Sequence, residues 1–349
     1  MRNKKLLIIK VKHMLIPFCI CLFALFLVVF SNNTLYAAKK GLTLWANSIV
    51  PTLFPFLIAT ELLGYTNLVS IIANMVNGIM KPIFNVSGIG AFPLIMGTIS
   101  GYPIGAKIVS NLKTQQKISS VEAERLIAYT NNSSPLFILG TIGIGLFGNK
   151  QVGILLLITH ILAGISVGFI FRYWKREPLS KNREKGVRPL FPYQISITNL
   201  GEVLSNSIMS AINTILIIGG FIVLFSVIIS IFESSGILRF ISNFFIPVLN
   251  IFKIPSCFAN GFFSGIIELT NGISIVALVP NKAISQNIIL CAFMLGFGSF
   301  CVLFQIMSII SKAHISIKPY IIGKLLQGTL AAVYTYLIIQ FIPIFNLNL

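Results

Sequence analysis

A glycine- and proline-rich stretch, Gly97–Lys107, lies inside a long apolar run and offers a place where a solute could bind. Pro103 lacks a backbone N–H and clashes with the carbonyl four residues earlier, so we expect no continuous helix here. Gly101 and Gly105 allow backbone angles that other residues avoid. Lipid offers no hydrogen-bond partners to the N–H and C=O groups of irregular backbone. The stretch therefore predicts a broken helix that either packs against other parts of the protein or lines a water-filled cavity. Transporters bind solutes at such breaks; a kinked helix without a ligand is the alternative.

Three more polar segments interrupt apolar runs. Five consecutive hydrogen-bonding side chains precede Pro135, and such a run is costly in lipid unless polar groups face it. The other two are 265–272, with a carboxylate at Glu268, and 296–300. We predict that residues of these segments line a solute cavity, although each alone could simply bond a neighbouring helix. The candidate solute-binding residues are Ser100, Gly101, Tyr102, Gly105, Lys107, Asn131, Asn132, Ser133, Ser134, Glu268, Thr270, Asn271, Gly272 and Ser299.

Two of these candidates carry charge. An intramembrane carboxylate indicates function by default, so Glu268 could carry a coupling proton or hold an amide or hydroxyl of the break. Lys107, one turn after the first break, is a candidate counter-charge for an anion. An alternative of equal weight is that Lys107 only helps to orient the chain in the membrane. The five cysteines have neither zinc nor disulfide spacing, and no metal site is predicted.

Composition indicates a membrane protein. Of 349 residues, 56% are hydrophobic and 10% are charged, against roughly 25% charged in soluble domains. A net charge of +18 would suggest nucleic acid in a soluble protein, but here we attribute it to the Lys and Arg of cytoplasmic loops. The expected fold is therefore an all-α polytopic membrane protein. Its expected partners are the lipid bilayer, a small anionic solute and, with the oligomeric state left open, another copy of itself; neither nucleic acid nor a cofactor is expected.

The apolar runs divide the chain into four parts. We predict an N-terminal transmembrane helix within 1–40, a first gate-like repeat over 41–171, a basic cytoplasmic linker over 172–200 and a second repeat over 201–349. The first apolar run is longer than the ~7–15 residues of a secretory signal, so it is expected to remain uncleaved. The predicted spans, apart from the broken segments, are 14–30, 42–66, 151–171, 205–232 and 320–342.

The two repeats carry the same features in the same order. The segment 82–86, Pro-Ile-Phe-Asn-Val, is matched 165 positions later by 247–251, Pro-Val-Leu-Asn-Ile. A cytoplasmic N-terminus and a cytoplasmic linker require the first repeat to cross the membrane an odd number of times, so the second must be inverted. If 88–111 and 256–280 re-enter rather than cross, which the sequence leaves open, 20 of 26 basic residues lie inside, and the C-terminus lies outside the cytoplasm. Paired broken helices in inverted repeats are typical of secondary transporters.

The motif series is specific. The series Ser100-Gly-Tyr-Pro-x-Gly-Ala-Lys107, then Glu122-Ala-Glu-Arg-Leu126, then Thr130-Asn-x-x-x-Pro-Leu-Phe-Ile138 resembles the YlbJ (SpoVV) family of sporulation integral membrane proteins, over residues 40–345. This family belongs to the superfamily of gate domains found in nucleoside and ferrous-iron transporters. The resemblance implies a role in moving dipicolinic acid across the mother cell's outer forespore membrane, which the spore cortex and heat resistance require.

Other functions remain as alternatives. A nucleoside or metal-ion transporter fits the wider superfamily, and Cys257, Cys291 and Cys301 keep a ferrous-iron pore open. A scaffold for cortex assembly would gain nothing from polar breaks in lipid. An enzyme is not expected, because the three histidines are scattered and the sequence has no phosphate-binding loop of the Walker type.

Overall fold

The computed structural model describes residues 2–175, 195–251, 254–280 and 284–341, and all regular elements within these ranges are helical. The predicted basic linker falls largely in 176–194, outside the described residues, so its role and its side of the membrane stay predictions. Among the described residues, five helices are long and apolar enough to cross a membrane, or six if a pair bent by 90°, Leu68–Phe84 with Gly88–Ile99, is one span. The chain is a multi-pass membrane protein.

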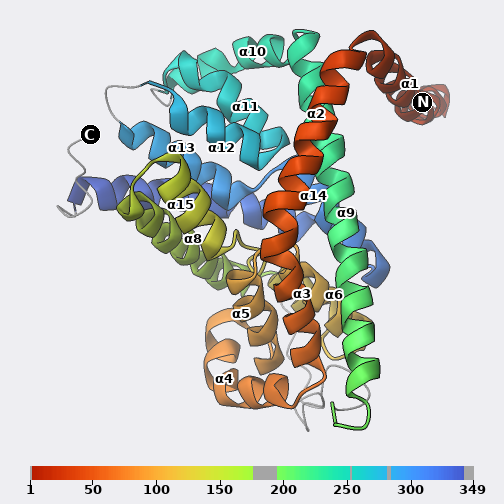
Figure 1. Cartoon of the computed structure of the whole chain (residues 1–349), viewed down its shortest axis with the longest axis vertical. Helices are drawn as coiled ribbons and strands as arrows, with labels where there is room; N and C mark the ends of the chain where they lie inside the picture. Colours follow the sequence, from red (N-terminus) through yellow and green to blue (C-terminus); the bar gives the residue numbers. More distant parts are fainter. Residues whose placement is uncertain (1, 176–194, 252–253, 281–283, 342–349) are drawn as a thin grey trace.

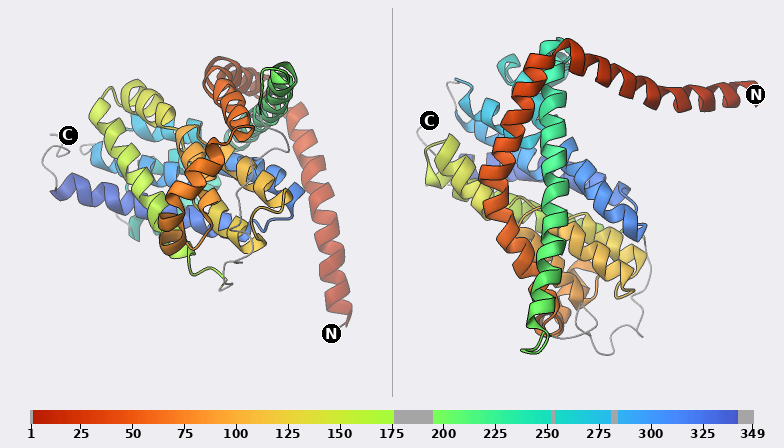
Figure 2. Two further views of the ribbon diagram at one scale, coloured as in Figure 1. Left: turned by 90° about the horizontal axis from the view of Figure 1, so that it is seen from below. Right: turned by 45° about the vertical axis from the view of Figure 1, so that its right-hand side comes forward.

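The N-terminal region differs from expectation. α1 (Arg2–Val29) projects away from the rest of the molecule (Figure 2). A turn at Phe30 is followed at once by a helical path of α2 (Ser31–Leu44), η1 (Trp45–Ile49) and α3 (Val50–Gly64). The helix that contains the predicted span 42–66 thus begins earlier, at Ser31, because nothing between residues 31 and 44 breaks it. The predicted boundary between residues 40 and 41 lies inside α2.

The remaining elements occur in two series of equivalent order. The first, beginning with α3, continues with α4 (Leu68–Phe84), η2 (Gly88–Gly90), α5 (Ala91–Ile99), α6 (Ile104–Thr114), α7 (Ser120–Ile127), η3 (Phe137–Leu146) and α8 (Lys150–Phe171). The second contains α9 (Leu200–Ser234), α10 (Ile237–Ile251), η5 (Ser256–Phe258), α11 (Ala259–Ile267), α12 (Leu269–Leu278), α13 (Ile284–Phe297), α14 (Phe300–Ile310), η6 (Ser311–Ala313) and α15 (Lys318–Phe341).

The second series is upside down relative to the first. In Figure 1, α4 lies at the lower end of the long axis, while its equivalent α10 lies at the upper end. The path through α2 and α3 descends beside α9, which ascends. Equivalent helices also contact one another, since α3 packs on α9 and α8 packs on α15. This arrangement is the inverted repeat that the order of sequence features predicts.

Each repeat contains a short helical hairpin closed by two glycines. Residues seven or eight apart would lie roughly 10–12 Å apart along a straight helix. A Cβ on Gly97 would instead stand 3.1 Å from the Cα of Gly105, and one on Gly265 would stand 3.3 Å from the Cα of Gly272. α5 therefore turns back into α6, and α11 turns back into α12. With 9 to 11 residues each, these helices are too short to span ~30 Å of hydrocarbon singly.

The acidic and basic motif at 122–126 holds helix ends in place. Ser119 and Glu122 form the predicted capping box of α7, with Ser119 Oγ accepting from Glu122 N at 3.0 Å. The fully buried Arg125 guanidinium donates to the carbonyls of Asn85, Trp174 and Lys175. These carbonyls lie just beyond α4 and α8, where helices leave acceptors unpaired. The motif thus stabilises the fold of the first repeat.

Candidate functional site

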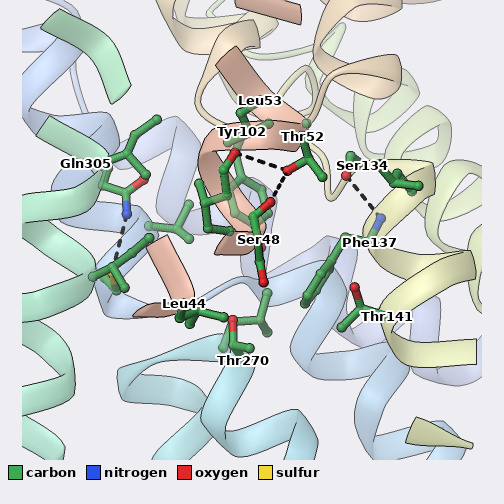
Figure 3. Close-up of a pocket in the computed structure, with 18 of the residues that line it drawn as sticks. Leu44, Ser48, Thr52, Leu53, Tyr102, Ser134, Phe137, Thr141, Thr270 and Gln305 are labelled. Atoms are coloured by element: carbon green, nitrogen blue, oxygen red, sulfur yellow. Dashed lines mark hydrogen bonds between the residues drawn. The ribbon is translucent and has the colours of Figure 1, made fainter. Parts of the chain in front are cut away.

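A cavity of about 430 Å³ lies where the two hairpins meet the middle of the α2–η1–α3 path. Figure 3 shows its lining converging from α3, the first break, η3, α12 and α14. The volume falls within the ~300–1,000 Å³ of small-molecule pockets. Of the predicted site residues, the structure brings six together on its wall: Ser100, Gly101, Tyr102, Ser134, Glu268 and Thr270.

The wall also carries polar residues that sequence reasoning missed. η1 and the start of α3 contribute Asn47, Ser48 and Thr52, and η3 contributes Thr141. Both Trp45–Ile49 and Phe137–Leu146 are π-helical, and π-helical turns frequently occur at functional sites. The signal available in the sequence was weak, because single hydroxyl and amide side chains in an apolar run also form ordinary helix contacts.

Glu268 forms the second break by capping the helix that follows it. Its side chain accepts from Thr270 N at 3.0 Å and from Asn271 N at 2.8 Å. A carboxylate at this position satisfies N–H groups that a helix start leaves unpaired. Within the polar segment 265–272 the break is confined to Glu268, because α11 ends at Ile267 and α12 already begins at Leu269. The carboxylate is nevertheless part of the cavity wall.

The polar run at Asn131–Ser133 is buried behind the cavity. Asn131 Oδ1 accepts from Ala106 N at 2.7 Å, which ties the run to the start of α6. Asn132 Nδ2 donates to Tyr129 O at 3.1 Å. Ser133 N donates to His160 Nε2 on α8 at 3.1 Å. Irregular backbone at this depth is therefore satisfied by neighbouring helices, as expected for a break packed against protein.

A buried lysine completes this network. Lys324 of α15 is 3% exposed. Its ammonium donates to Asn131 O and to Gln327 Oε1, and Gln327 Nε2 donates to Asn132 Oδ1 at 2.8 Å. Lys324 and Gln327 are not among the site residues predicted from the sequence. A lysine and a glutamine three residues apart in the apolar run 320–342 were the signal, because they share one helix face.

Lys107 lies away from this cavity, one helical turn along α6. Its ammonium is 2.6 Å from Glu61 Oε1 of α3 and donates to Ser210 Oγ and Thr214 Oγ1 of α9, each at 2.9 Å. The counter-charge candidate therefore already has a carboxylate partner. This arrangement links α6 to both long helices beside it.

Four other candidates have contacts within the fold. Gly105 faces the carbonyl of Thr130, and Gly272 faces the backbone of Gly265. Asn271 Nδ2 donates to Ser264 Oγ at 2.9 Å. Ser299 Oγ accepts from Val302 N at 3.3 Å and caps α14 after a break at residues 298–299.

The cavity wall is mostly apolar, with a minority of hydroxyl and amide groups and one formal charge among its described residues. Among the lining residues that the structure describes, Glu268 is the one acidic side chain, and there is no lysine or arginine. Hydroxyl and amide groups supply donors, and Phe137, Ile218 and Ile222 supply apolar surface. Such a wall suits a small, partly flat, polar solute. Within the described residues no three His, Cys, Asp or Glu side chains gather as a metal site.

Comparison with known proteins decides the family. A model of gate domains described as "Nucleoside recognition" matches residues 46–173, which contain the first hairpin. The chain is 36% identical over 314 residues, 86% of its own length and 76% of the relative's, to "Sporulation integral membrane protein YlbJ" of Bacillus subtilis (strain 168). The chain belongs to the YlbJ family. No solved structure matches it.

Membership of the YlbJ family agrees with the resemblance carried by the motif series. That family name describes an integral membrane protein of sporulation and no enzyme class. Since the gate model covers only the first repeat, the second hairpin, with Glu268 and Thr270, enters the site through the tertiary structure. Cys301 lines the cavity, whereas Cys291 is buried elsewhere and Cys257 is exposed.

Proposed function

We propose that this protein is a sporulation transporter that moves dipicolinic acid across the outer forespore membrane of the mother cell, supplying the spore for cortex formation and heat resistance. The observation that carries the proposal is the cavity between the two inverted hairpins, lined by Ser100 and Tyr102 from one and by Glu268 and Thr270 from the other. Secondary transporters place their solutes between such broken helices.

The chemistry of the wall fits a small aromatic acid. Hydroxyl and amide donors from η1, α3 and α14 can hold carboxylate oxygens, and donors to charged acceptors give the stronger hydrogen bonds. Phe137 offers a flat apolar face. A ring with two carboxyl groups is small relative to the 430 Å³ available.

Glu268 makes binding dependent on a positive charge. An ionised Glu268 would repel a dianion across a medium of low dielectric constant. The solute must therefore enter with a proton on Glu268, or together with a cation. We infer that transport is coupled to one of these, with the N-terminus in the mother-cell cytoplasm.

A nucleoside is the second candidate solute. The family model is described by nucleoside recognition, and the wall combines uncharged donors with an aromatic side chain. An ionised Glu268 would also repel a dianion, whereas it would not repel a neutral nucleoside.

The test is uptake of labelled dipicolinate and labelled uridine by proteoliposomes containing the purified protein, compared with empty liposomes. We expect saturable dipicolinate uptake that unlabelled dipicolinate inhibits and uridine does not. Uptake of uridine alone would replace the proposal with the nucleoside alternative. Absence of both would reject small-solute transport.

A further inference from the structure

A second cavity of about 250 Å³ lies beside the first. Both cavities are lined by residues of α9, of the first break and of α14. α9 lines the first cavity with Ile218 and Ile222, and it lines the second with residues from Ser210 to Ile218. The two stretches together cover about 18 Å of α9 at ~1.5 Å per residue. The cavities are therefore stacked along the direction of α9, which runs the length of the molecule in Figure 1.

The other two elements repeat this order. Around the first break, Ser100–Tyr102 line the first cavity, whereas Pro103 and Lys107 line the second. On α14, Cys301 and Val302 line the first cavity and Ser308 lines the second, which Lys312 of the following η6 also lines. Three separate segments of the chain thus run from the first cavity to the second.

A thin partition separates the two spaces. Ile218 and Gln305 belong to the walls of both cavities, and the peptide joining Tyr102 to Pro103 passes from one wall to the other. Ile218 and Gln305 are buried, at 4% and 3% exposure. Because these two side chains line both cavities, their movement is the change that we expect to join them.

The electrostatic character changes across the partition. The first cavity has Glu268 and no basic residue, whereas the second has Lys107 and Lys312 and no acidic residue among its lining. The charge of Lys107 is paired with that of Glu61 in a salt bridge. Lys312 lies exposed in η6 and has no hydrogen bond or ion pair within the described parts of the chain. The second cavity therefore offers a free positive charge to an anion.

We propose that the two cavities are consecutive stations of one transport route, with Ile218 and Gln305 as the gate between them. The second station receives the carboxylates of the solute through Lys312, supported by Lys107 and the hydroxyl groups around it. This inference rests on the proposed function for the identity of the solute, but the route itself does not depend on it.

The route is tested by thiol labelling. In a chain whose five native cysteines are replaced, Thr141→Cys reports on the first cavity and Asn213→Cys on the second. A membrane-impermeant maleimide is applied to right-side-out and to inverted vesicles. We expect each cysteine to react from one face only, and the two from opposite faces; reaction of both from the same face would overturn the route.

The gate is tested in the same background. Ile218→Ala combined with Gln305→Ala is expected to make Thr141→Cys reactive from both faces, because the partition is opened. Leu216→Ala is the control, since Leu216 is 55% exposed on α9 and lines neither of the two cavities. Unchanged one-sided labelling in the double variant would refute the gate.

The anion station is tested by uptake. Lys312→Gln is expected to raise the half-saturating dipicolinate concentration about fivefold, the effect of losing one nearby charge in a wet site, while Lys312→Arg preserves it. Lys318→Gln, an exposed lysine outside both cavities, is the control. Equal values for Lys312→Gln and wild type would refute the station. Lack of any wild-type dipicolinate uptake would instead refute the proposed function, and the labelling experiment would still decide the route.

Discussion

At the scale of single residues, the acidic side chain of the cavity is both a helix cap and a wall group. Glu268 occupies the N–H groups at the start of α12 that an incoming carboxylate would otherwise use. A proton on Glu268 would weaken this cap and remove the negative charge facing the solute. Protonation can therefore couple the conformation of the second hairpin to anion binding.

Replacing Glu268 separates the two roles. Glu268→Gln keeps one acceptor for the α12 cap but cannot change charge, so we expect a folded protein without dipicolinate transport. Glu268→Ala also loses the cap, worth roughly 1 kcal/mol, and should unfold at a lower temperature. Proteoliposome uptake and thermal unfolding in detergent measure the two effects. Wild-type uptake by Glu268→Gln would dismiss a coupling role.

The ion pair between Lys107 and Glu61 gives a second prediction at this scale. The two side chains are 15% and 9% exposed. Removing one partner of a fully buried pair costs about 3–5 kcal/mol, mainly because the other charge is left alone. Since both face small cavities, we expect Lys107→Met to destabilise the protein by roughly 2 kcal/mol.

The double variant Glu61→Gln with Lys107→Met is the matched control. It leaves no unpaired charge, so its unfolding temperature should return toward that of the wild type. A double variant no more stable than Lys107→Met would show that the two charges are independent. The comparison uses thermal unfolding in one detergent at one pH.

At the scale of elements, the hairpins depend on backbone contact at glycine. A Cβ on Gly272 would collide with the backbone of Gly265, and one on Gly97 would collide with the carbonyl oxygen of Thr130. Backbone cannot move aside as a flexible side chain can, because it is fixed by its own hydrogen bonds. Each hairpin therefore tolerates no side chain at its crossing point.

We expect Gly272→Ala to cost at least ~1–3 kcal/mol through overpacking and to reduce the yield of monodisperse protein. Gly220→Ala is the control, because a Cβ there meets nothing within 4 Å and alanine favours the helix. Size-exclusion chromatography and thermal unfolding of the two variants give the measurement. Similar stability of both would contradict the close crossing of α11 and α12.

At the scale of the whole molecule, inversion places two similar hairpins on opposite sides of one cavity. The pairs α3 with α9 and α8 with α15 flank them. Because the two halves are equivalent but upside down, opening toward one face and opening toward the other can use related movements. The buried Lys324 network ties α15 of the second repeat to the break at Asn131 in the first.

Topology is tested with reporter fusions. Positive charge favours the cytoplasmic side, so a fusion after Lys185 should report the cytoplasm. Fusions after Lys150 and Leu349 should report the opposite side. The same side for Lys185 and Leu349 would contradict the inversion of the second repeat within the membrane.

Much of the architecture was accessible from the sequence. Long apolar runs can only be satisfied as helices in lipid, and Pro103, Pro135 and Glu268 mark interruptions that the structure confirms. The repeated Pro-x-x-Asn segments at 82–86 and 247–251 indicated two equivalent halves. Family membership followed from the motif series, which the match to the Bacillus subtilis relative supports.

The membrane-spanning character and the breaks could be predicted from the sequence because they depend on local hydropathy and on proline, and the inverted order because it depends on the count of crossings. Which polar side chains face the cavity became clear only from the folded chain. The side chain of Asn131 turned to α6 and that of Asn132 to α15, Lys107 turned to Glu61, and Asn47 reached the wall from a π-helical turn. The physical reason is that a polar side chain in lipid must find a partner, and residues distant in the chain provide either another helix or the solute.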